Sequence, residues 1–499
     1  MKGEELLDAM EHIDADLIEA ADKPVRKHTT PYWVAAVAAV LSIVLIIGLM
    51  RSLFPALPVV QGTQPAELPA LGAPQSPHTL QLMNMVAAPK YPEMAPYPNK
   101  SGTNDYLGSY SDAYKAWLAD QKAQYDQPRG YADSLSGFFR KSIPQFLNTS
   151  ENSIYSPLNV YMALAMLAET TDGNSRQQIL DLLGLDSIEA LRQQVGHVWN
   201  AHYCNDGATT MLLGNSLWLS DRFNFHQECM DILANTYYAS AFHGTMGSDS
   251  FNQQLRQWLN SQTGGLLADS IDNMKMDADT VFALASTVYF SAGWGGNFSK
   301  EETKEKAFHC GDKDLMTPFM CDTFTGDYYY SDNFGAVRLS LSGENDMWLI
   351  LPDKGHTVAE ILESDEYLKM VQSPSNWEKQ RMNIKITLEL PKFDISSNLE
   401  LSDGLKNLGI TDVFDENVSD FSALIEHDDL YVDRIEHAAR VRIDEDGCIG
   451  TAYTFINFYG GAAPPSNLRK ITFTLDRPFL FLVTSRDQLP LFAGVVAEP

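Results

Sequence analysis

The residue types that most often carry out catalysis are present, but no spacing in the sequence organises them into a site. Eleven histidines are scattered among many serines and aspartates, so some Ser/His/Asp triple can always be found. A working triple needs a local motif that places its members, and the chain contains no G-x-S-x-G, H-E-x-x-H, phosphate-loop or dinucleotide-binding glycine motif. We therefore expect a protein that is not an enzyme and that uses no cofactor.

The cysteines argue against a metal site and against a disulfide scaffold. The 499 residues include five cysteines and no C-x-x-C pair, the spacing typical of zinc sites. We expect no bound metal. The cysteines are Cys204, Cys229, Cys310, Cys321 and Cys448.

The composition is that of a globular protein with an acidic surface. Hydrophobic residues make up 44% of the chain and charged residues 20%, which is enough for a sizeable core. The chain has 36 Lys and Arg against 65 Asp and Glu, so its formal net charge is −29. Because such a surface repels a phosphate backbone, we expect no nucleic-acid partner.

One run near the N-terminus has the length and composition of a membrane span. Residues 33–50 carry no charge, and at about 1.5 Å per residue this run would form a helix of roughly 27 Å, close to the thickness of a bilayer core. More cations precede the run than follow it, which places the N-terminus in the cytoplasm. We expect a cytoplasmic segment over residues 1–31 and a transmembrane helix over 32–50 that holds the rest of the chain outside the cell membrane.

The region after this span changes from extended chain to folded domain. Six prolines punctuate residues 51–77, a stretch with almost no charge, and such spacing favours an extended stalk. We expect residues 78–130 to be an N-terminal extension of the folded domain. Residues 131–499 would then form the domain itself.

The segment Asn152–Leu183 predicts two helices separated by a glycine turn. Ser156 can cap the first helix, and Pro157 suits its first turn because a missing N–H costs nothing there. Small alanines then allow this helix to pack closely under a sheet. In this segment the chain resembles the serpins, the serpin-type serine protease inhibitors.

Further segments follow in the order that this family has. Residues 282–294 look like a central strand of the main sheet, and Ile386–Ile395 looks like another strand of the same sheet. Phe473–Val483 matches the C-terminal signature of the family. The resemblance implies an α+β serpin fold, with helices around a large central mixed sheet A, two smaller sheets and an exposed reactive-centre loop.

Serpin inhibition, as the resemblance implies, is mechanical. A serine protease attacks the loop and forms an acyl-enzyme, the cut loop inserts into sheet A as a new strand, and deacylation stops. The partner would be a protease held in a covalent complex, and we expect the inhibitor itself to be a monomer.

The loop, from Asp444 to about Leu468, can form a buried strand. Because a strand alternates its side chains, every second residue from Cys448 shares one face, and these residues are small and uncharged. The resemblance makes this the face that insertion buries, and it makes Gly447 the hinge glycine, which can adopt backbone angles that other residues avoid. The residues assigned to the hinge are Glu445, Gly447, Cys448, Gly450, Ala452 and Thr454.

Two groups of residues match positions that support the sheet in the family. Lys392 and Glu445 match a salt bridge at the top of the sheet, near Trp294. A polar cluster lies beneath the point where the strands part, and Ser286 stands in it where many members have Asn. The members of this cluster are Ser156, Asn159, Ser286 and His437.

The bond that a protease would cut lies between the hinge and Pro464. Gly461-Ala462 and Ala462-Ala463 both place a small side chain before the bond, which fits elastase-like and subtilisin-like pockets and gives nothing to a trypsin-like one. Cleavage after Tyr459 by a chymotrypsin-like protease is left open. The region assigned to the reactive bond comprises Tyr459, Gly460, Gly461, Ala462 and Ala463.

A rival function remains alongside inhibition. Inhibitory members usually have Thr or Ser where Cys448 stands, and Tyr453 is bulkier than usual, so insertion could be slow. The alternative is a non-inhibitory serpin that acts as a binding or adhesion module and that proteases merely cleave.

Overall fold

The computed structural model describes residues 85–92, 94–98, 109–271, 274–296, 298–311, 313–426, 430–448 and 468–499. The chain divides into two compact units, Met1–Ala70 and Leu71–Pro499, and every described residue lies in the second. The expected cytoplasmic segment, membrane span and stalk thus lie outside the described residues. No helix in the described ranges is both long and apolar enough to cross a bilayer.

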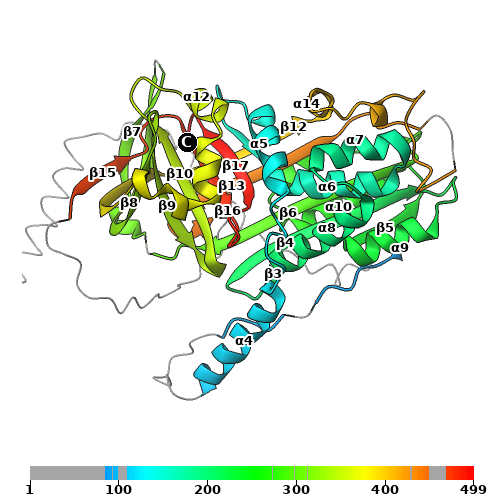
Figure 1. Ribbon diagram of the computed structural model, residues 1–499, viewed down its shortest axis with the longest axis horizontal. Helices are drawn as coiled ribbons and strands as arrows, with labels where there is room; N and C mark the ends of the chain where they lie inside the picture. The colour runs from blue at the N-terminus through cyan, green and yellow to red at the C-terminus, as the bar shows by residue number, and fades with distance from the viewer. Residues whose placement is uncertain are drawn as a thin grey trace, which may run out of the picture. The chain divides into compact units, whose positions relative to one another are not determined.

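The first sheet, which corresponds to sheet A, has the strand order β1-β5-β4-β6-β14-β13-β12, with β3 paired to β4 (Figure 1). It is mixed as expected, because β4 and β5 are parallel while its other pairs are antiparallel. Its strands are β1 (Met85–Ala87), β3 (Cys204–Asn205), β4 (Thr209–Ser220), β5 (Ala239–Gly244), β6 (Phe282–Gly293), β12 (Phe393–Glu400), β13 (Glu436–Asp444) and β14 (Gly447–Cys448).

The second sheet corrects the expectation of two separate smaller sheets. A single path, β15-β11-β8-β9-β10-β16-β17-β2, joins nine strands, with β7 paired to β8. The joint is β8, which is 18 residues long and pairs with β11 along most of its length and with β9 at its end. These strands are β2 (Ser153–Tyr155), β7 (Lys304–Cys310), β8 (Lys313–Tyr330), β9 (Phe334–Leu341), β10 (Asn345–Pro352), β11 (Arg381–Pro391), β15 (Lys470–Thr474), β16 (Phe479–Thr484) and β17 (Pro490–Val496).

Helix α6 is the central helix of the core. Thirteen of its fourteen residues are buried, as expected for a helix that is apolar on nearly every side, and it packs against β6, β17 and α7. Pro157 stands at its first turn as predicted. The helices are α4 (Ser109–Tyr125), α5 (Leu135–Phe146), α6 (Pro157–Thr170), α7 (Gly173–Leu183), α8 (Ile188–His202), α9 (Gln227–Thr236), α10 (Asp249–Gln262), α11 (Ala268–Ile271), α12 (Val358–Glu363), α13 (Glu366–Gln372) and α14 (Ser402–Asn407).

One expected strand proves to be two. The prediction that Ile386–Ile395 forms a single strand of sheet A is wrong, because β11 ends at Pro391 in the second sheet and β12 begins at Phe393 in the first. The chain changes sheets at Lys392, whose N–H donates to the carbonyl of Pro318 at 2.9 Å. A proline cannot donate to a further strand, so Pro391 suits the end of β11.

The segment before the main domain packs on the edge of sheet A. β1 pairs with β5, and Tyr91 enters a pocket of aromatic rings on the same side. Its ring centroid lies 5.6 Å from that of Trp199 and 5.9 Å from that of Tyr238, and its hydroxyl donates to the carbonyl of Tyr238 at 3.2 Å. Only 8% of Tyr91 is exposed, so this residue anchors the extension.

Replacing this anchor should destabilise the domain. Tyr91→Ala removes a buried ring, so we expect the free energy of unfolding in urea to fall by about 2–4 kcal/mol. Val86→Ala on the neighbouring strand, where the side chain is 49% exposed, should change it by less than about 0.5 kcal/mol. Equal effects of the two substitutions would show that the aromatic pocket does not hold the extension.

Candidate functional site

The hinge of the predicted loop lies inside sheet A, between two of its central strands. Gly447 pairs with Gly293 and Cys448 with Ala292 on β6, and the same two residues pair with the end of β13 on their other side. β13 and β14 thus form a hairpin whose turn is Glu445-Asp446.

Gly447 occupies a position that only glycine fits. Its φ is +147°, and a Cβ built on it would lie 2.3 Å from the carbonyl oxygen of Ala292. Any larger residue would push β14 away from β6. The next residue, Cys448, is fully buried, so a small side chain is required there as well.

The two central strands are not paired with each other. Within the described residues, β6 and β13 are linked only through β14, which pairs with the last residues of each. Over most of their length, β6 and β13 therefore receive no backbone hydrogen bonds from each other. A strand continuing from Cys448 would pair with both, and such pairing is the chemistry that this arrangement offers.

A set of side chains holds the hairpin turn in place. The Lys392 ammonium lies 2.8 Å from the Glu445 carboxylate, to which the Thr303 hydroxyl donates at 2.7 Å. The Trp294 indole N–H donates to the carbonyl of Asp444 at 2.8 Å. The structure therefore brings together Lys392, Glu445 and Trp294, as the sequence suggested. Burial opposes ionisation of Glu445, but the bonds from Lys392 and Thr303 outweigh it and hold the pKa of this carboxyl below its usual value.

Sequence reasoning missed two contributors to this turn. Thr303 follows the short helix η2 (Lys300–Glu302), and Lys300 on that helix lies 3.1 Å from the Asp446 carboxylate. Nothing in the spacing around these two residues indicates a partner near 445. Of the residues in these contacts, only Asp446 could be found from the sequence, because it lies at the start of the predicted loop.

The polar cluster beneath the parting strands also assembles. The Ser286 hydroxyl donates to the side-chain oxygen of Asn159 at 2.6 Å, and the Asn159 amide donates to the Ser286 carbonyl at 3.3 Å. The amide that many family members have on the strand is thus supplied here by helix α6. The backbone N–H of Ser156 donates to Nε2 of His437 at 3.0 Å. Helix α6 and the residue before it are in this way bonded to β6 and β13.

The expected cap of helix α6 is not formed. Ser156 stands at the position before the helix, but its hydroxyl makes no capping bond and donates instead to the carbonyl of Leu491 at 2.6 Å. Tertiary contact with β17 outcompetes the local bond because Ser156 is almost fully buried against that strand. The residue therefore belongs to the cluster rather than to the helix end.

Part of the predicted site lies outside the described residues. This holds for the hinge residues beyond Cys448 and for the whole reactive-bond region. The residues concerned are Gly450, Ala452, Thr454, Tyr459, Gly460, Gly461, Ala462 and Ala463.

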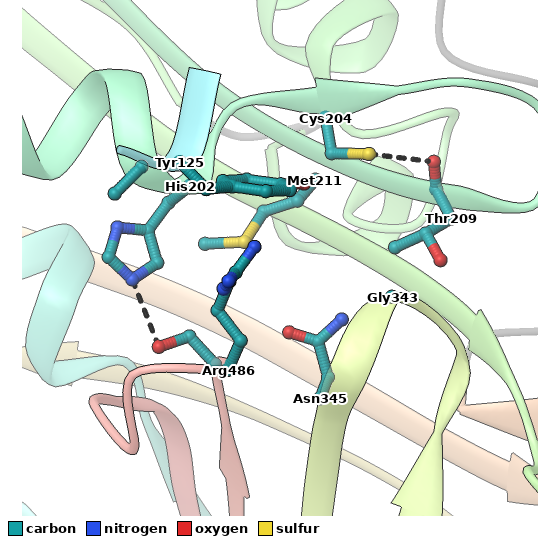
Figure 2. A pocket seen from close by; sticks show the side chains of 10 residues that line it. Tyr125, His202, Cys204, Thr209, Met211, Gly343, Asn345 and Arg486 are labelled. Atoms are coloured by element: carbon teal, nitrogen blue, oxygen red, sulfur yellow. Dashed lines mark hydrogen bonds between the residues drawn. The ribbon is translucent and has the colours of Figure 1, made fainter. Parts of the chain in front are cut away.

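A small pocket is lined by both a cysteine, Cys204, and a histidine, His202 (Figure 2). It lies where α8, β4 and the turn after β16 meet. His202 donates from Nδ1 to the Val198 carbonyl at 2.7 Å, and its Nε2 accepts from Ser485 at 2.9 Å, so neither ring nitrogen serves the Cys204 thiol. Burial raises the pKa of Cys204, which keeps the thiol protonated. The pair is not a catalytic nucleophile and base.

Comparison with known proteins identifies the family. A family model described as Serpin (serine protease inhibitor) matches residues 138–499. Alpha-1-antiproteinase 2 of Equus caballus is 27% identical over 400 residues, covering 78% of this chain and 91% of the relative. Corticosteroid-binding globulin of Oryctolagus cuniculus is 28% identical over 388 residues, covering 74% of this chain and 96% of the relative. The chain belongs to the serpin family.

The fold also has a solved counterpart. The native state of tengpin, a thermophilic serpin, superposes with a TM-score of 0.65 at 24% identity, covering 75% of this chain and 95% of tengpin. This likeness supports the serpin fold, with its large mixed sheet A and surrounding helices.

The cluster predicts a loss of stability in mild acid. Burial lowers the pKa of His437 to about 4, whereas an unfolded histidine titrates near 6.5. The unfolded chain therefore takes up the proton first, and stability should fall by about 3 kcal/mol as the pH drops from 6.5 to 4. Urea unfolding at a series of pH values measures this slope, which His437→Gln should reduce. The buried His202, whose pKa burial also lowers, contributes to the slope that remains.

The exposed His309 provides a control of opposite sign. Its bond to Asp314 raises its pKa, so it favours the folded state in mild acid, and His309→Gln should lose that small gain. An unchanged slope between pH 6.5 and 4 in His437→Gln would contradict the role of His437.

Proposed function

We propose that this serpin inhibits serine proteases as a suicide substrate. The observation that carries the proposal is β14, because it starts a strand between β6 and β13, and these two strands have no other pairing with each other in the described part of the chain. Gly447 permits the close approach to β6, and the burial of Cys448 supports the assignment of this residue to the inward face of the loop. Alpha-1-antiproteinase 2 carries inhibition in its name, which supports the same function.

The protease serine attacks the carbonyl carbon of the reactive bond, forming an ester and releasing the amine of the following residue. The cut loop then continues β14 further into sheet A, where its backbone groups pair with β6 and β13. About fifteen inserted residues at roughly 3.3 Å each would carry the esterified protease some 50 Å. Its active site is distorted in the process, so water no longer cleaves the ester.

The residues before the reactive bond favour elastase-like or subtilisin-like proteases. Gly461 and Ala462 both offer a small side chain to the primary pocket, and neither offers a cation to a trypsin-like pocket. The site of action would be the cell surface, with residues 32–50 as the membrane anchor and 51–77 as the stalk. This arrangement rests on the charge-free run and the cations before it.

A binding module is the second candidate. Corticosteroid-binding globulin, at 28% identity, is a relative whose name states binding rather than inhibition. A protein of this kind would be cleaved in the loop and would release active protease. Inhibition and binding are thus separated by the fate of the protease.

Residues 78–499 mixed with an elastase-like or subtilisin-like protease should give a band at the summed mass on a denaturing gel. The ester survives denaturation, so this band identifies the acyl complex. Mass spectrometry of the released C-terminal peptide should begin at Ala462 or Ala463. A clipped chain with fully active protease, for both protease types and for a chymotrypsin-like one, would reject inhibition in favour of the binding module.

A charged residue on the inward face should convert the inhibitor into a substrate. Ala452→Arg would bury a cation in the sheet, which slows insertion, so we expect the fraction of covalent complex to fall at least ten-fold while cleavage continues. The matched control is Thr451→Arg, because alternation places residue 451 on the opposite face. Equal trapping by both variants would contradict insertion.

A further inference from the structure

The loop that a protease must find carries no charge. Residues 449–467 contain no Asp, Glu, Lys or Arg, although the chain as a whole has a net charge of −29. Electrostatic steering raises the rate of association between proteins, and charged groups near the contact provide it. In this protein such groups must come from the scaffold beside the loop.

Three cations stand where the loop rejoins the scaffold. Arg469 and Lys470 follow the loop directly, and Lys470 begins β15 at the edge of the second sheet (Figure 1). β11 is the neighbour of β15, and Lys385 on it is the direct partner of Lys470 in the parallel register. All three side chains are exposed. We call Lys385, Arg469 and Lys470 the root patch.

The root patch is not neutralised by the described part of the chain. The ion pairs between described residues include none of its three members, whereas nearby Arg381 pairs with Asp327 and Lys306 with Glu389. Like charges that face each other across two strands destabilise a sheet. The Lys385–Lys470 pair therefore costs stability and has no compensating anion among these residues.

Threonines stand beside Lys385 and Lys470 in the strand register. Thr325 is the partner of Lys385 on β8, Thr387 lies two residues further along β11, and Thr472 lies two residues beyond Lys470. These side chains are short and uncharged, and they stand beside the two lysines in the strand register. A protein surface could approach the lysines without meeting a bulky group.

The root patch is also within reach of a protease at the reactive bond. Lys470 lies eight positions after Ala462, so the distance is at most roughly 26 Å even for a fully extended chain. A protease that holds the loop in its cleft spans a distance of this order on each side.

We propose that the root patch binds an acidic area beside the active-site cleft of the target protease. This inference rests on the proposed function, because it names the kind of protease surface that the inhibitor selects. The patch would speed the encounter and favour proteases of this charge, while the reactive bond selects the primary pocket.

The test measures the second-order rate constant at which intact loop is consumed. This rate includes covalent complex and simple cleavage, so it reports on the encounter even if inhibition fails, while the gel bands report on inhibition separately. The probe is one subtilisin-like protease before and after succinylation of its surface lysines, which makes its surface acidic. The variant is Lys385→Gln with Lys470→Gln.

We expect the double variant to react about three- to ten-fold more slowly than the parent with the succinylated protease at low salt. The difference should vanish near 0.5 M NaCl, because the Debye screening length is then only on the order of a few Å. The matched control is Lys90→Gln with Lys141→Gln, two exposed lysines on other elements that change the net charge equally. A rate equal to the parent, or a loss equal to that of the control, would overturn the proposal.

Discussion

The structure depends on a backbone constraint in the middle of sheet A. β6 and β13 run through the centre of the domain, yet within the described chain they meet only through the two residues of β14. Peptide groups in such a position need hydrogen-bond partners, and a strand is the partner that satisfies them in series. Under the proposed mechanism, the surrounding contacts share one role, which is to control when and how far that strand enters.

The contacts act at two levels of the sheet. At the top, a turn of two acidic residues is bound by a lysine, a threonine and an indole N–H. Lower down, helix α6 bonds to β6 through Asn159, and Ser156 just before the helix bonds to β13 through its N–H. The exchange of Ser and Asn between strand and helix leaves the contact in place, because one side still supplies an amide and the other a hydroxyl. The contact between helix α6 and strand β6 therefore forms whichever of these two elements carries the amide.

Much of this was readable from the sequence, for reasons that differ between residues. β6 was expected over residues 282–294 and spans Phe282–Gly293, because a long apolar run has few alternatives. The Lys392–Glu445 contact could be assigned only through the family resemblance, since 53 residues separate the two. The change of sheet at Lys392 and the bond from Ser156 to Leu491 were not predictable, because tertiary geometry decides them. Thr303 was missed for the same reason.

The buried thiol of Cys448 has a consequence for observing the molecule at work. With β14 in place the sulfur is fully covered, and burial keeps it protonated and unreactive. An alkylating reagent reaches it only during excursions in which the strand detaches. The rate at which Cys448 is alkylated therefore measures how often β14 detaches from the sheet, with no label added to the protein.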